Sequence, residues 1–90
     1  MSDELEKTLL ERGGRYGEFR ENANISQKLK DTLHSSRGWD DLYSDQKEAL
    51  EMIAVKISRI LCGDPSYEDN WVDISGYASL VLRRIQDEKA

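Results

Sequence analysis

Hydrophobic residues recur at helical spacing through the second half of the chain. Two stripes with steps of three and four residues follow each other, and this spacing puts each stripe on one face of an α-helix. The first stripe holds Leu50, Ile53, Ile57, Ile60 and Leu61, and the second holds Trp71, Ile74, Ala78, Val81 and Ile85. Gly63 and Pro65 separate the two stripes, and such a short connection predicts an antiparallel hairpin of residues 45–62 against residues 67–87.

The first half of the chain predicts two more helices. The first begins at Asp3, whose spacing from Glu6 is that of a capping box, and ends at the glycine pair 13–14. The second covers residues 15–35, and residues 24–26 could interrupt it.

A loop is expected over residues 36–43, and serines at 44 and 66 are the expected N-caps of the last two helices. Only one proline and no alternating apolar run are present, which argues against a sheet. We therefore predict an all-α, compact four-helix protein, one domain over residues 1–90, built around the hairpin of its third and fourth helices.

The length and net charge of the chain argue against some classes of binding partner and favour others. Ninety residues with a net charge of −5 do not supply the basic face that general nucleic-acid binding needs. No apolar run approaches the roughly 20 residues of a membrane span, and no signal peptide is recognisable. A chain this short buries little surface alone, so we expect a homo-oligomer, with Met52 and Val55 as a second packing surface. The single cysteine, Cys62, suits a reducing cytosol.

Two pairs of polar residues on the hairpin are candidates for a metal site. Glu48 and Glu51 stand three apart on the third helix, and Asn70 and Asp73 stand three apart on the fourth. Residues three apart lie side by side on a helix, so the four oxygen-bearing side chains could together hold Mg²⁺. Solvated glutamates early in a helix would give the same pattern.

Two further features of the hairpin bear on this site. A basic neighbour, Lys56 or Arg59, could neutralise Asp73 in place of a metal. Gly76 lies in the middle of the fourth helix, where glycine costs roughly 1 kcal/mol relative to alanine, and this indicates either a close helix crossing or a ligand near the backbone.

A second polar cluster lies in ERGGRYGEFRE, residues 11–21. Arginines beside a glycine-rich turn at a helix N-terminus can bind phosphate, although the segment lacks the GK[ST] ending of a P-loop. Arg12, Arg15 and Tyr16 are therefore candidate substrate-binding residues, together with Lys56 and Tyr77 on the hairpin. The alternative is a helix end followed by solvated arginines.

These motifs resemble those of two families. The pattern R-x-x-YG, then K-I-x-R-I-x-x-G-x-P, then D-x-W-x-D-I-x-GY-A is similar to that of short, uncharacterised phage and prophage proteins. Here it reads as residues 12–17, residues 56–65 and residues 70–78, with Asn70 at the first position of the last motif. This resemblance covers nearly the whole chain and implies phage or prophage origin and a place in the cytosol of the bacterial host.

The hairpin also resembles the MazG-like all-α nucleotide pyrophosphohydrolases, which carry E-x-x-E on one helix and E-x-x-D on the next. This resemblance implies Mg²⁺ as cofactor, Glu48, Glu51 and Asp73 as catalytic residues, and Glu48, Glu51, Asn70 and Asp73 as metal ligands. Asn70 departs from the pattern, because it replaces a carboxylate with a neutral amide.

The lead hypothesis is a MazG-like nucleotide-binding or Mg²⁺-dependent nucleotide pyrophosphohydrolase-type protein of phage origin. The alternative is a non-enzymatic phage accessory or anti-defence protein that binds a host protein through its acidic helical surface. In that alternative the contacts would depend on exposed Trp39, Tyr43 and Tyr67, since aromatic residues dominate interface hot spots.

Overall fold

The computed structural model describes residues 3–90, which form four α-helices and one short 3-10 helix without any strand. The elements are α1 (Asp3–Tyr16), α2 (Phe19–Ser35), η1 (Trp39–Asp41), α3 (Ser44–Cys62) and α4 (Glu68–Lys89). The predicted all-α class and four-helix composition are therefore confirmed.

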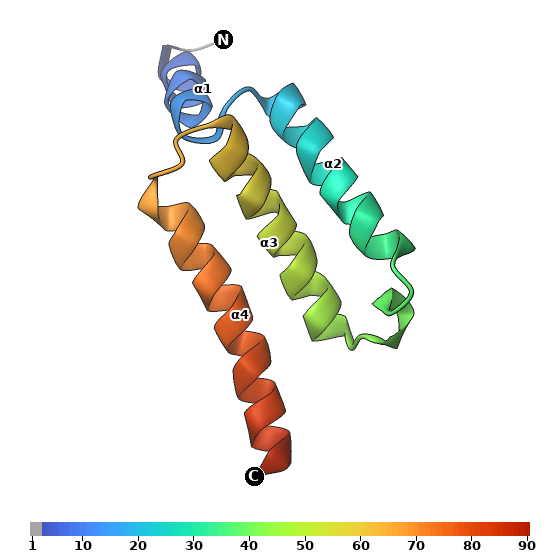
Figure 1. The fold of residues 1–90 in the computed structure, drawn as a ribbon. Helices are drawn as coiled ribbons and strands as arrows, with labels where there is room; N and C mark the ends of the chain where they lie inside the picture. Colours follow the sequence, from blue (N-terminus) through green and yellow to red (C-terminus); the bar gives the residue numbers. More distant parts are fainter. Residues whose placement is uncertain (1–2) are drawn as a thin grey trace.

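The central element is α3, which lies between α2 and α4 (Figure 1). The predicted hairpin of the third and fourth helices is confirmed, because α3 and α4 run antiparallel and share the most extensive packing. Figure 1 shows α2, α3 and α4 side by side, with α1 near the end where α2 begins and α3 ends. The three long helices thus form a single layer, capped at one end by α1.

No helix among residues 3–90 is long and apolar enough to cross a membrane.

The boundaries around the first turn differ from those predicted. Instead of ending at the glycine pair 13–14, α1 continues through it to Tyr16. A glycine inside a helix costs only about 1 kcal/mol, whereas Gly17 has a φ of +83° and a left-handed residue of this kind ends a helix. Consequently α2 begins at Phe19 rather than at residue 15.

Residues 24–26 do not interrupt α2, because Ser26 is buried within the helix instead of capping a new one. The N-caps of the later helices are also one residue away from the predicted serines. Tyr43 precedes α3, and its backbone N–H donates to Gln46 Oε1 at 2.9 Å. Tyr67 precedes α4, while the backbone N–H of Ser66 donates to the carboxylate of Asp64 at 2.9 Å.

The two predicted apolar stripes do not form a closed core. In residues 3–90 the only hydrophobic side chains that are buried are the small Ala49 and Ala54. Leu50 and Ile57 of the α3 stripe remain 38% and 36% exposed. The physical reason is the single layer: α3 packs between α2 and α4, and no further layer of helices among residues 3–90 covers its open face.

Candidate functional site

Two interlocking turns hold the end of α1 against the end of α3. A Cβ added at Gly17 would overlap the carbonyl group of Cys62, and one added at Gly63 would overlap the carbonyl group of Arg15. The backbone N–H of Asp64 also donates to the Arg15 carbonyl at 2.9 Å. Only glycine allows two backbones to approach this closely, so these two glycines fix the residues at the end of α1 relative to α3 and α4.

Arginine and tyrosine side chains gather where these two turns meet. We call this group the Tyr16 cluster; it consists of Arg12, Arg15 and Tyr16 of α1, Arg59 of α3, and Tyr67. The guanidinium carbons of Arg12 and Arg59 lie 6.0 and 4.6 Å from the Tyr16 ring centroid. The Arg15 carbon lies 5.2 Å from the Tyr67 ring centroid. The two rings meet edge to face, with centroids 5.9 Å apart.

The charges of this cluster are not neutralised within the described chain. Among residues 3–90, none of the cluster's three arginines forms an ion pair with a carboxylate, although the protein has 18 acidic residues and a net charge of −5. A guanidinium held against an aromatic ring still has N–H groups at its edge for a carboxylate or phosphate. The Tyr16 cluster is therefore a local site of positive charge on an acidic protein.

A buried hydrogen-bond network connects Tyr16 of the cluster to α2 and α3. Asn22 of α2 donates from Nδ2 to the Tyr16 carbonyl at 3.0 Å. Its Oδ1 lies 2.6 Å from the hydroxyl of Ser58, which is fully buried and also lies 2.7 Å from the carbonyl of Val55. Because Asn22 links three helices through one side chain, it fixes the position of Tyr16.

Asn70 is the polar residue whose surroundings leave a group unsatisfied. It lies in the first turn of α4, three residues after Tyr67, and is only 1% exposed. Its Nδ2 has no hydrogen-bond partner, and a buried unpaired donor costs about 1–3 kcal/mol. A polar side chain kept in such a position is unusual in a structural core.

The acidic candidates do not form a metal site in the described chain. Within residues 3–90 no three His, Cys, Asp or Glu residues are grouped so that they could hold a metal ion. Asp73 instead pairs with Lys56 at 3.0 Å, one of the two basic partners expected for it. Glu51 lies 3.6 Å from the His34 ring nitrogen, and Glu48 is exposed. This arrangement does not fit Mg²⁺, because each ion would need several converging oxygens.

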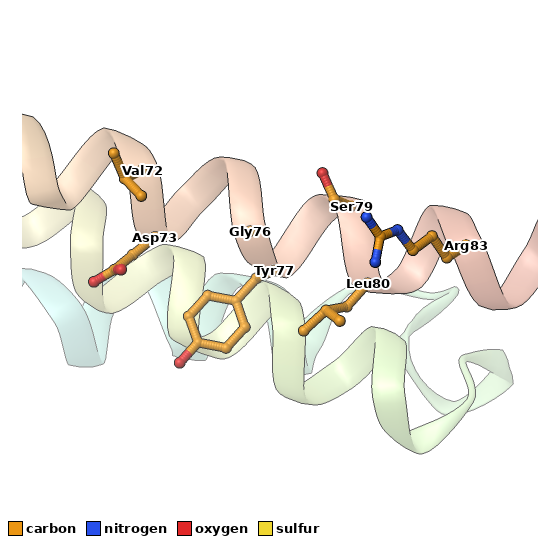
Figure 2. A pocket seen from close by; sticks show the side chains of 7 residues that line it. All are labelled: Val72, Asp73, Gly76, Tyr77, Ser79, Leu80 and Arg83. Carbon is orange, nitrogen blue, oxygen red and sulfur yellow. The ribbon is translucent and has the colours of Figure 1, made fainter.

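Lys56 and Tyr77 are not part of the Tyr16 cluster: Lys56 of α3 pairs with Asp73 of α4, and Tyr77 lines a hollow on α4. Tyr77 and Asp73 line one side of an open hollow of about 460 Å³ along α4, and Figure 2 shows both side chains extending from the same side of that helix. Gly76 also lines this hollow, and a Cβ added to it would meet nothing within 4 Å. The predicted close helix crossing at Gly76 is therefore not found within residues 3–90.

The Tyr67 hydroxyl and the Cys62 thiol both have pKa values above their ordinary ones. The hydroxyl of Tyr67 donates to the Asp69 carboxylate at 2.9 Å, and this bond raises the pKa of Tyr67. Burial, followed by the charge of Glu21, raises the pKa of the Cys62 thiol. Both shifts favour the protonated forms, the neutral phenol of Tyr67 and the thiol of Cys62.

The aromatic residues expected to be exposed behave differently from one another. Tyr43 is exposed. Trp39 is half-buried against the His34 ring, with ring centroids 4.9 Å apart, and Tyr67 is half-buried in the Tyr16 cluster. Of the three, only Tyr43 presents the open surface that an interface anchor needs.

Sequence reasoning placed Arg12, Arg15 and Tyr16 in one site, and the structure brings them together. It did not identify Arg59 and Tyr67 as members of that site, because they are distant in sequence from α1. The signal that could have found them was the pair of glycines at positions 17 and 63. Glycines directly after two helices indicate two turns that can come into close contact.

Comparison with known proteins gives one match. Residues 3–85 match the family described as a domain of unknown function (DUF6378). No curated protein and no solved structure matches the chain. Since the family match covers both interlocking turns and more than half of the chain, this chain belongs to the DUF6378 family.

Proposed function

We propose that this protein binds a nucleotide through its phosphate groups at the Tyr16 cluster, as a MazG-like nucleotide-binding protein of phage origin. One observation carries the proposal: three arginines without ion pairs are held around two tyrosine rings at one end of an acidic chain. The resemblance of the hairpin to nucleotide pyrophosphohydrolases points to the same class of ligand.

The chemistry of the cluster matches a chain of phosphates. Each guanidinium can bind phosphate oxygens in a two-pronged manner, and Arg15 and Arg59 are restrained by the rings that they contact. Restraint before binding reduces the entropy lost when the ligand arrives. Three positive charges balance most of the charge of a nucleoside triphosphate.

Hydrolysis of the nucleotide would be a separate step, and the Tyr16 cluster does not provide the metal ligands for it. It would require Glu48, Glu51 and Asp73 to converge on Mg²⁺, whereas Glu51 faces His34 and Asp73 is paired with Lys56. We therefore propose nucleotide binding and derive no metal-dependent reaction for these residues.

The experiment is a calorimetric titration of the protein with three compounds: dATP, inorganic tripolyphosphate and deoxyadenosine. Binding through phosphates predicts that the first two bind and the nucleoside does not. Arg59→Met and Arg15→Met keep an apolar stem but remove the guanidinium. Each should weaken dATP binding roughly tenfold or more, since a hydrogen bond to a charged group contributes about 1.5–3 kcal/mol.

The matched control is Arg37→Met, which removes an exposed arginine from the loop after α2 and should leave dATP binding unchanged. Repeating the titration with Mg²⁺ and assaying pyrophosphate release tests the hydrolytic activity. Absence of binding by both phosphate compounds, or equal losses in all three arginine variants, would overturn the proposal. Binding of a host protein would then be the leading hypothesis, with exposed Tyr43 as its first contact to test.

A further inference from the structure

One face of the α3–α4 hairpin is apolar and has no charged residue. We define the apolar face as Leu50, Ile53, Ile57 and Leu61 of α3 with Ala78 and Val81 of α4. Leu50, Ile53, Ala78 and Val81 line the same hollow of about 310 Å³, so α3 and α4 contribute to one surface. Ile57 and Leu61 continue it along α3, because they follow Ile53 at steps of four residues.

This face is open to solvent along its length. Leu50 and Ile57 are more than one-third exposed, and Leu61 is 66% exposed. A helical layer with an apolar surface requires a second layer to bury it. Within residues 3–90 no element supplies that layer, since α2 and α4 lie beside α3 and α1 lies across one end.

The total surface shows how much area remains to be covered. The chain exposes 6749 Å², whereas a compact monomer of 10.4 kDa would expose about 5,400 Å². The excess is larger than the roughly 800 Å² that each partner buries in a standard protein interface. The radius of gyration of 15.7 Å also exceeds the roughly 12 Å expected for 90 residues.

We propose that a second copy of this chain covers the apolar face, so that two α3–α4 hairpins pack against each other as a four-helix bundle. A twofold dimer brings the same patch of each subunit together, and this patch is suited to such contact because it has no charge that its own copy would repel. The net charge of −5 is carried elsewhere on the surface. A basic or acidic partner would find no complementary charge on this face.

The face differs from the one that the sequence predicted. Met52 and Val55 were expected to form the second packing surface, but both are half-buried within the chain. The large hydrophobic side chains of α3 that are exposed are instead Leu50, Ile57 and Leu61.

The test is the mass of the protein in solution, measured by light scattering across the micromolar concentration range. The wild type should have twice the chain mass of 10.4 kDa. Ala78→Glu puts a carboxylate at the centre of the face and should give the single-chain mass. Ser79→Glu is the matched control, because it adds the same charge to the next residue of α4, which lines the other hollow, and should leave the dimer intact.

Circular dichroism of each variant separates dissociation from unfolding. If Ala78→Glu loses its helical signal, Leu61→Glu replaces it, because Leu61 lies near the end of α3 and is already largely exposed. A wild type with the single-chain mass throughout would overturn the proposal and leave the face to a different protein. A dimer that resists both substitutions on the face would also overturn it, because its interface would lie elsewhere.

Discussion

The side of α3 that faces α2 and the apolar face of α3 differ in the kind of side chain that they bury or leave exposed. Towards α2, the buried residues are polar: Ser58, Asn22 and Ser26. Their central hydrogen bonds, from Asn22 to Tyr16 and between Ser58 and Asn22, are made within the chain. Towards the apolar face, large hydrophobic side chains such as Leu50 and Ile57 remain partly in water.

On the α2 flank the described chain pairs its central buried polar groups by itself, whereas Asn70 Nδ2, at the start of α4, stays unpaired. A buried polar group without a partner costs more than a partly exposed leucine, and its partner must lie at a fixed distance and angle. Apolar surface has no such directional requirement and can be covered by any complementary shape. We infer that the α2 flank positions the Tyr16 cluster within one chain, while the apolar face is left for association.

The largest effect is expected for Ile57→Ala on the apolar face. If a second chain covers Ile57, the substitution should lower the free energy of unfolding by about 2–5 kcal/mol, as for other core isoleucines. The loss should be smaller in the Ala78→Glu background, where the side chain stays partly in water. Urea unfolding at several protein concentrations measures both values. A loss below about 1 kcal/mol in the wild-type background would show that no partner covers Ile57.

Ser58→Ala probes the opposite flank and should have the next largest effect. It leaves Asn22 Oδ1 buried without its 2.6 Å partner, so we expect a loss of about 1–3 kcal/mol. Ser35→Ala is the matched control, because it removes the hydroxyl of an exposed serine, which donates to the Thr32 carbonyl at 3.2 Å. Equal losses in the two variants would contradict the idea that buried polar bonds hold this flank.

The same contrast explains how much of the structure could be predicted from the sequence. The helices followed from apolar periodicity and the hairpin from Gly63 and Pro65, because these signals are local. The periodicity could not show which helix or which chain packs over each apolar stripe. The stripe containing Ile57 was predicted to lie in the core, but a stripe is the same whether its cover comes from this chain or from another.

The candidate site was predictable only where its residues are close in sequence. Arg12, Arg15 and Tyr16 lie within one helical turn, so their proximity did not depend on the fold. The metal site required Glu51 and Asp73 to meet across two helices, and the competing partners His34 and Lys56 decided their contacts instead. Choices between such partners depend on the rotation of each helix about its axis, which periodicity fixes only roughly.

Gly76→Ala examines the side of α4 that faces away from the apolar face. A methyl group at this position would meet nothing within 4 Å. Because alanine favours the helical backbone over glycine by about 0.5–1 kcal/mol, the variant should be more stable by that amount in thermal or urea unfolding. A destabilised Gly76→Ala would mean that another molecule packs closely against this side of α4, contrary to the dimer proposed here.

The smallest effect is expected at the ion pair that joins the start of α3 to the last turns of α4. Arg84 donates to both Asp45 carboxylate oxygens at 2.8 Å, and this hydrogen bonding lowers the pKa of Asp45 from its ordinary value of 3.8. The stabilisation is therefore complete above that ordinary pKa and is lost as the pH falls through the lower pKa of the folded state.

Asp45→Asn should accordingly be less stable than the wild type at neutral pH, and the two unfolding curves should converge in acid below 3.8. Asp31→Asn is the control, since Asp31 is exposed on α2 and has no ion pair in residues 3–90. A pH-independent difference for Asp45→Asn would mean that the pair is not formed in solution. Lys56 and Asp73 would then be the remaining ion pair between α3 and α4 among residues 3–90.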